Sequence, residues 1–159
     1  MEPMFNLIRD NRSYIEIQRV PYEEPYALCL MISVGNGSFS GSLEYYCNTS
    51  DLMEMGVAFE SLQQQANHSY VYQRGSSNPE DRWAYFFHIS VLVLDSSGHC
   101  HLNLEIDNNR TPPERASCSF VISTDVSAIK RLGRLLKTFA QLEHSILRWS
   151  DTEGEVVVE

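Results

Sequence analysis

Two histidines and a glutamate alternate within one short stretch, Gly98-His-Cys-His-Leu-Asn-Leu-Glu105. On a β-strand, His99, His101 and Glu105 project from one face, because successive side chains point to opposite faces. Two imidazoles and one carboxylate would suit iron, manganese or zinc. The alternative is a solvated strand face with polar outward positions, and two alternating histidines beside a turn are a loose pattern. We therefore predict no metal and no cofactor here.

The spacing His-x-His-x-x-x-Glu resembles the first metal-binding motif of the cupins. In this chain Gly98 directly precedes the histidines instead of standing well ahead of them, and no glycine follows Glu105 at the family's distance. No second motif supplies a further histidine. A small cupin-like, metal-dependent enzyme that uses His99, His101 and Glu105 is therefore kept as the alternative hypothesis.

His88 is the second candidate for chemistry, because the strand pairing derived below places it opposite Glu105. A histidine beside a carboxylate can act as a general base. The nearest hydroxyl, Ser90, lacks the sharp turn and the oxyanion donors that acyl transfer requires. We predict a cross-strand polar pair, no catalytic residue and no enzyme. The basic residues between Lys130 and Lys137 are interpreted as a solvated helix face.

The element that positions these side chains is the stretch Trp83–Asp107, which predicts a long β-hairpin around an Asp-Ser-Ser-Gly turn. With Leu94 opposite His99, every second cross-strand pair is apolar. A slip of one residue would set Val91 against Asn103, so the alternation selects the first register. The apolar pairs are then Val93–Cys100, Val91–Leu102, Ile89–Leu104 and Phe87–Ile106, and the other face holds His88–Glu105, Ser90–Asn103 and Leu92–His101.

A second hairpin is predicted for residues 27–34 and 39–46, because an Asn-Gly pair lies in the intervening Gly35-Asn36-Gly37-Ser38. The register that gives one apolar face sets Val34 opposite Phe39, Leu30 opposite Leu43 and Leu28 opposite Tyr45. Two hairpins with one clean apolar face each favour an antiparallel sheet that is covered on one side.

Apolar residues recur at helical spacing in residues 50–62 and 125–149. Gly133 beside the second apolar stripe suggests close packing on the sheet. With further strands predicted at 13–20, 69–74 and 117–123, we expect an α+β fold: a single antiparallel β-sheet of about six or seven strands with two helices packed on one face. Residues 1–150 are expected to form one domain and residues 151–159 a loose acidic tail.

The composition restricts the class of partner. A net charge of −9 in 159 residues argues against a nucleic-acid binder and suits a basic protein partner. No apolar run approaches the ~20 residues of a membrane span, and the start of the chain lacks a signal-peptide pattern. Four widely spaced cysteines indicate reduced thiols. We expect a cytoplasmic protein without membrane, nucleic-acid or small-molecule partners.

The second face of the central hairpin mixes apolar and polar side chains, among them Leu92, His101 and Glu105. This face is too apolar for simple solvent exposure and too polar for a core. Apolar anchors with a polar rim are typical of a binding face. The alternative, which the sequence leaves open, is that a loop or the tail covers it.

The order of motifs resembles the WapI-like immunity proteins over about residues 28–142. The resemblance rests on Phe39-Ser-Gly-Ser-Leu-Glu-Tyr-Tyr46, the capped helix from Asp51, Gly98–Asp107, and Phe120-Val-Ile-Ser-Thr-Asp125 followed by a long helix. It implies a small, non-enzymatic, cytoplasmic bacterial antitoxin that protects a cell from a polymorphic or contact-dependent inhibition toxin.

A toxin domain that attacks nucleic acid has a positive cleft, which an acidic inhibitor can block with carboxylates. We therefore expect a basic cognate toxin domain, a nuclease, as the partner. Glu105 and Asp107, with Glu23, Glu24 and Glu80 at the rim, are expected to supply the charge, and Leu92 and His101 the dry centre.

Overall fold

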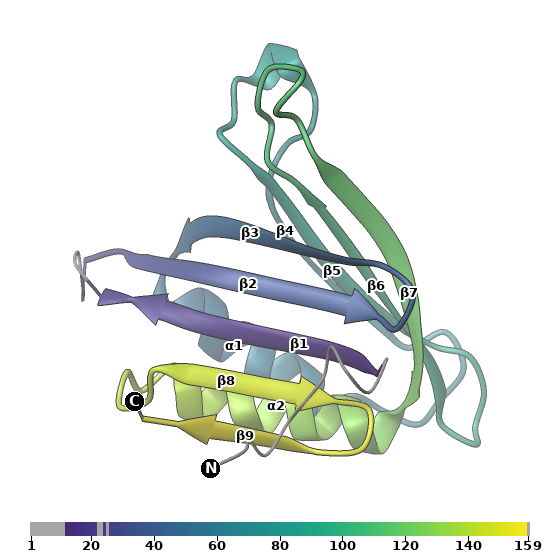
Figure 1. Ribbon diagram of the computed structural model, residues 1–159. Coiled ribbons are helices and arrows are strands. Elements are labelled where there is room, and N and C mark those ends of the chain that lie inside the picture. The colour runs from purple at the N-terminus through teal and green to yellow at the C-terminus, as the bar shows by residue number, and fades with distance from the viewer. Residues whose placement is uncertain (1–11, 22–23, 25, 159) are drawn as a thin grey trace.

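The computed structural model describes residues 12–21, 24 and 26–158 (Figure 1). Its elements, in chain order, are β1 (Ser13–Val20), β2 (Leu28–Asn36), β3 (Ser40–Cys47), α1 (Thr49–Glu60), β4 (Ser69–Gly75), β5 (Phe86–Val93), β6 (His99–Asp107), β7 (Ser117–Asp125), α2 (Val126–Phe139), β8 (Ile146–Ser150) and β9 (Gly154–Val157). A 3₁₀ turn, Pro79–Asp81, lies between β4 and β5. No helix in the described ranges is long and apolar enough to cross a membrane.

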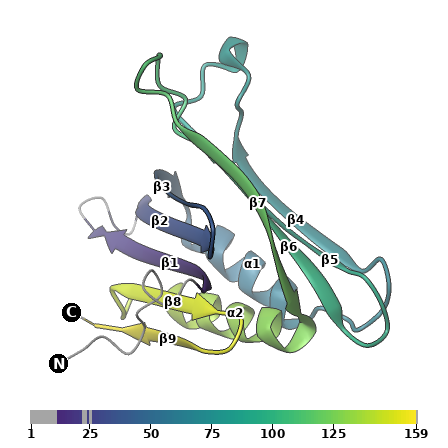
Figure 2. The ribbon, with the colours of Figure 1, turned by 45° about the vertical axis from the view of Figure 1, so that its right-hand side comes forward.

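The strands form two antiparallel sheets, so the predicted single sheet with two helices on one face is wrong. One sheet has the order β3-β2-β1-β8-β9, and the other has the order β4-β5-β6-β7. Figure 2 shows the four-stranded sheet crossing the five-stranded one at a steep angle. Each hairpin has one apolar face, and this face would be buried both in two facing sheets and in a single sheet covered by helices. The alternation of apolar and polar residues therefore could not distinguish these two folds.

The central hairpin has the predicted register. Ile89 lies opposite Leu104 and Val91 opposite Leu102, while His88 faces Glu105 and Leu92 faces His101. The inward side chains of β5 and β6 are buried, so the alternation of apolar and polar residues did identify the core face.

The hairpin of β2 and β3 is shifted by two residues from the predicted register. Leu30 lies opposite Tyr45 instead of Leu43, and Val34 lies opposite Gly41. The loop contains only Gly37 and Ser38, because the Asn36 carboxamide accepts hydrogen bonds from the Ser38 and Phe39 amides, each at 2.9 Å. Gly37 has φ = +92°, as the first central residue of a type II′ turn requires.

Helix α2 ends at Phe139, well before the predicted Trp149, and residues 146–150 form strand β8. β8 pairs with β1, which places Trp149 opposite Ile15 and buries both. Residues 154–157, expected to be part of a loose tail, form β9 and pair with β8. Burial beside β1 therefore outweighs the helical pattern in this segment, which is the usual result when packing opposes local propensity.

The two helices cross at a pair of glycines, Gly56 of α1 and Gly133 of α2. A Cβ atom on Gly133 would lie 2.5 Å from the Glu60 amide nitrogen and 2.6 Å from the Gly56 carbonyl oxygen. Gly133 is therefore packed closely against the other helix, not against the sheet as predicted. These backbone contacts leave no room for a side chain at position 56 or position 133.

One core cluster joins both sheets and both helices. Tyr45 of β3 stacks on Phe87 of β5 with ring centroids 4.8 Å apart, which links the two sheets directly. The cluster includes residues of both predicted hairpins and of the second predicted helix: Leu30, Leu43, Phe87, Ile89, Val91, Leu102, Leu104, Ile129, Leu136 and Phe139.

Replacement of Gly133 by alanine tests the helix crossing. Alanine favours a helix by about 1 kcal/mol over glycine, so on propensity alone the variant would be more stable. The overlap with α1 predicts the opposite sign, a loss of about 1–3 kcal/mol in the free energy of unfolding. Urea denaturation measures this, and a variant as stable as the wild type would contradict the crossing.

Replacement of Leu104 by alanine tests the core. The side chain is buried inside the cluster, so its truncation is expected to cost about 2–5 kcal/mol. The matched control is Val71→Ala on the same sheet, because Val71 is exposed and should change stability by about 0.5 kcal/mol or less. Equal effects of the two substitutions would contradict the assignment of the buried face.

Candidate partner-binding surface

The four-stranded sheet presents a continuous outer face, which we define by the outward residues of its strands. Strand pairing aligns these residues in three rows: Ser69-Leu92-His101-Ser123, Val71-Ser90-Asn103-Val121 and Gln73-His88-Glu105-Ser119. Three apolar side chains on the outer face are well exposed: Val71 (57%), Val121 (44%) and Leu92 (36%). Glu105 is the one charged residue in the three rows, so a flat, weakly polar surface results.

The C-terminal tail does not cover the outer face within the described residues. Its ordered part, β9, pairs with β8 in the other sheet. None of the described loops covers the centre of the face, since Val71, Leu92 and Val121 stay exposed. The sequence left open whether a loop or the tail covers this face. The described part of the tail does not cover it, and the central rows face solvent.

Two of the predicted interface residues, Leu92 and His101, lie side by side on the outer face. They form a cross-strand pair, and His101 is half-buried. Glu105 is exposed and makes no hydrogen bond or ion pair with the described residues. His88 lies opposite Glu105 as predicted, but its ring nitrogens contact the Gln73 Oε1 (3.1 Å) and the Ser90 Oγ (3.2 Å) instead.

The histidine motif is spread along β6. His99 and Glu105 are six residues apart, which is about 20 Å on an extended strand. The His99 Nδ1 contacts the Asp95 Oδ2 at 2.8 Å, and hydrogen bonds from His99 lower the pKa of Asp95. Across the part of the chain that the structure describes, no group of three or more His, Cys, Asp or Glu side chains is placed to hold a metal.

Asp107 was predicted to supply charge to a partner, but it is buried and its charge is compensated. Its Oδ2 accepts a hydrogen bond from the Arg115 Nη2 at 2.8 Å, and its Oδ1 accepts one from the Asn109 amide at 2.8 Å. Phe86, which pairs with Asp107, is also buried, so the neighbouring loops cover this end of the outer face. Asp107 lies at the strand end beside a loop arginine, so its carboxylate is paired within the fold.

The other predicted carboxylates have different environments. Glu24 is mostly buried and forms a bidentate ion pair with Arg19, at 2.6 and 3.0 Å. Glu80 is exposed in the 3₁₀ turn, beyond the end of the outer face. Glu23 lies outside the described residues. Of the predicted carboxylates that the structure describes, only Glu105 is exposed within the outer face.

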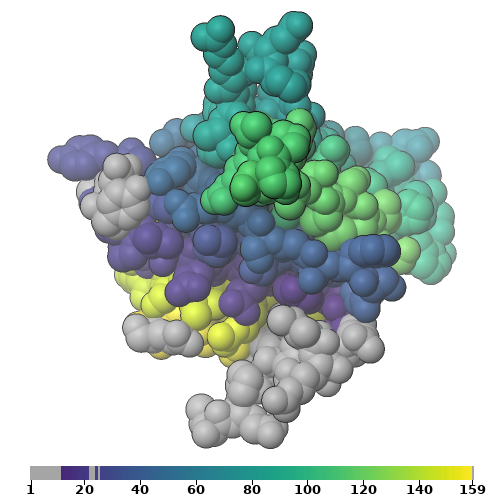
Figure 3. Space-filling view, turned by 45° about the horizontal axis from the view of Figure 1, so that its top comes forward, coloured from purple at the N-terminus to yellow at the C-terminus, as the bar shows by residue number. Residues whose placement is uncertain are grey.

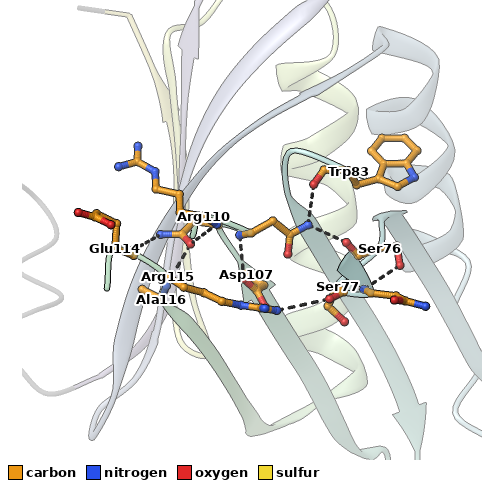
Figure 4. A network of polar contacts seen from close by, with 11 residues as sticks. Ser76, Ser77, Trp83, Asp107, Arg110, Glu114, Arg115 and Ala116 are labelled. Atoms are coloured by element: carbon orange, nitrogen blue, oxygen red, sulfur yellow. Dashed lines mark hydrogen bonds and ion pairs between the residues drawn. The ribbon is translucent and has the colours of Figure 1, made fainter. Parts of the chain in front are cut away.

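Sequence reasoning missed the far end of the four-stranded sheet, where two loops form a tip (residues 76–85 and 108–116). Figure 4 shows the polar network that joins them. The Asn109 Nδ2 donates to the carbonyl oxygens of Ser76 (2.7 Å) and Trp83 (3.0 Å), so one side chain ties both loops together. The loops are remote in sequence, and no periodic pattern signals their contact.

No family model matches the chain, and no curated protein is similar to it in sequence. Among solved structures, the plant transcriptional regulator PBF-2 is similar with a TM-score of 0.43 and 9% identity, over 81% of this chain and 75% of that chain. WHY3 from Arabidopsis thaliana gives a TM-score of 0.42 and 11% identity, over 81% of each chain. Likenesses this low carry no argument about function.

The Asp107–Arg115 contact predicts a pH dependence of stability. Burial by itself raises the pKa of Asp107, but the hydrogen bonds from Arg115 and the Asn109 amide outweigh burial and hold the pKa below its usual value. A lowered pKa stabilises the fold above the unfolded-state pKa of about 3.9, and this contribution is lost as the pH falls through the folded-state pKa.

We therefore expect Asp107→Asn to lower the urea midpoint at pH 7, with a deficit that shrinks as the pH falls below about 4. Glu143→Gln, at an exposed position, is the control and should match the wild type at both pH values. A deficit that is the same at pH 7 and pH 3 would show that the carboxylate charge is not responsible.

Proposed function

We propose that this chain is an immunity protein, a cytoplasmic antitoxin that binds a cognate toxin domain and covers its active site. The observation that carries the proposal is the outer face of the four-stranded sheet. It combines exposed apolar residues with serine, asparagine and histidine, and the described residues do not cover it. An apolar centre with a polar surround is the usual composition of a protein interface.

Leu92 and His101 form the expected centre of this interface. They are adjacent, lie in the middle two strands and have Val71 and Val121 in the neighbouring row. A partner that seals this area against water would gain most of its affinity from such central contacts. We expect loss of the Leu92 anchor to raise the dissociation rate.

Charge identifies the class of toxin in this proposal. The chain carries a net charge of −9, and Glu105, two rows from Leu92 and His101, is an exposed carboxylate with no ion pair to the described residues. A toxin with a basic, phosphate-binding cleft, such as a nuclease domain, complements this charge. The attraction would speed encounter, and salt would weaken it.

The test is a binding titration against the toxin domain encoded beside the gene for this chain. Leu92→Asp is expected to weaken binding at least about 30-fold through the dissociation rate, because it places a charge in the dry centre. Val57→Asp on α1 is the control, since Val57 is also an exposed apolar residue but lies away from the outer face. Its affinity should equal that of the wild type.

Glu105→Lys is expected to lower the association rate at low salt, and the difference should fade as salt rises. The exposed Glu143 provides the matched charge reversal, Glu143→Lys. Absence of binding by the wild type would refute the function. Wild-type affinity in both the Leu92 and the Glu105 variants would place the interface elsewhere.

A further inference from the structure

The tip contains a hollow of about 390 Å³ between its two loops. Its lining includes Arg82, Arg110, Arg115 and Trp83, and no aspartate or glutamate. Figure 3 shows the two loops next to each other, the teal one at the top and the green one directly below it. The protein has a net charge of −9, so a hollow whose only charged lining residues are three arginines differs in charge from the protein as a whole.

Glu80, Asp81 and Glu114 belong to the same two loops but do not line the hollow. Two of the lining arginines make no ion pair. Arg115 pairs with Asp107, whereas the side chains of Arg82 and Arg110 form no ion pair or hydrogen bond within the described ranges. Four of the other arginines pair within the fold: Arg12 with Glu153, Arg19 with Glu24, Arg74 with Asp51, and Arg148 with Glu16 and Glu155. The hollow therefore offers two available positive charges.

Trp83 adds an apolar surface that is already fixed in place. The residue is 44% exposed, and its ring packs edge-to-face on Tyr85 with centroids 5.9 Å apart. Its carbonyl oxygen accepts the hydrogen bond from Asn109. Because this network holds the backbone, little conformational entropy of the loop would be lost when a ligand covers the ring. Tryptophan and arginine are also the residues most enriched among energetically dominant contacts of protein interfaces.

The separation of these groups indicates the shape of the ligand. In Figure 4 the side chains of Arg110 and Trp83 lie on opposite sides of the network, with the Asp107–Arg115 pair below them. An extended ligand such as a peptide suits groups placed in this way. The guanidinium group matches the planar, two-oxygen geometry of a carboxylate.

We propose that the tip binds an extended acidic peptide segment of a partner protein. Its carboxylates contact Arg82 and Arg110, and an apolar side chain between them packs on Trp83. This site is separate from the outer face, and its occupation does not depend on toxin binding there. The segment belongs to a second partner protein.

The probe is a fluorescein-labelled eight-residue peptide of alternating glutamate and leucine, compared with the same peptide carrying glutamine in place of glutamate. We expect saturable binding of the acidic peptide in fluorescence anisotropy, at least about tenfold tighter than the neutral one and weakened by salt. Unlabelled peptide should also change the tryptophan emission. Trp149 is fully buried, so this signal reports Trp83 and should vanish in Trp83→Phe.

The double variant Arg82→Gln, Arg110→Gln should weaken peptide binding about tenfold without lowering the melting temperature, because neither side chain is bonded within the described fold. The matched control is Lys130→Gln, Arg134→Gln, which removes two charges from α2, where neither has an ion-pair partner among the described residues. The control should retain the wild-type affinity within about twofold.

Three results would overturn the proposal: equal binding of the neutral peptide, equal weakening by the control, or displacement of the peptide by millimolar inorganic phosphate or a thymidine octamer. The last of these would identify a phosphate site instead. The arginine variant is also titrated with the toxin domain, to which it should bind like the wild type. Failure of the peptide site and failure of the toxin-binding function are thereby distinguished.

Discussion

Burial of the inner face of the four-stranded sheet is the interaction on which the rest of the structure depends. Phe87, Ile89 and Leu104 enter one cluster with both helices and the other sheet, and the stacking of Tyr45 on Phe87 joins the sheets. Because side chains alternate along a strand, burial of one face directs the other outward. The exposed row of Val71, Ser90, Asn103 and Val121 is thus a direct consequence of how the core packs.

The helices make this arrangement possible because they occupy little space where they cross. Gly56 and Gly133 bring the two backbones into contact. Helix α2 also connects the sheets covalently, since β7 of one sheet leads into it and β8 of the other follows it. A wider crossing would move β8 relative to β7, and so would change how the five-stranded sheet meets the inner face of the other sheet.

Charge is distributed unevenly over the four-stranded sheet. The outer face is nearly neutral and the tip hollow is lined by arginines, while Glu80, Asp81 and Glu114 lie in the tip loops outside the lining of the hollow. Asp107 shows why net charge alone is a poor guide to a binding site. Its carboxylate accepts hydrogen bonds from Arg115 and the Asn109 amide in the tip, so it is not available to a partner. A partner of the outer face therefore meets Glu105 and apolar groups, not a dense acidic patch.

The sequence by itself determined which face of each hairpin is buried, because one-residue slips exchange the faces and are penalised at every pair. For Trp83–Asp107 it also determined the register, since the Asp-Ser-Ser-Gly turn closes the strands at Leu94 and His99. In the β2–β3 hairpin a shift of two residues preserves every face. Alternation therefore could not distinguish the two registers. The hydrogen bonds that the Asn36 side chain accepts in the folded turn select the observed one.

Only the tertiary structure decided how many sheets there are and what lies at the tip. Residues 146–150 carry a pattern that suits a helix, yet they become β8 because β1 offers an unpaired edge and a buried place for Trp149. The polar contacts that build the tip join Asn109 to Ser76 and Trp83, positions 33 and 26 residues away along the chain. Local periodicity carries no information about contacts at that separation, because it records which side of an element is buried and not which element lies against it.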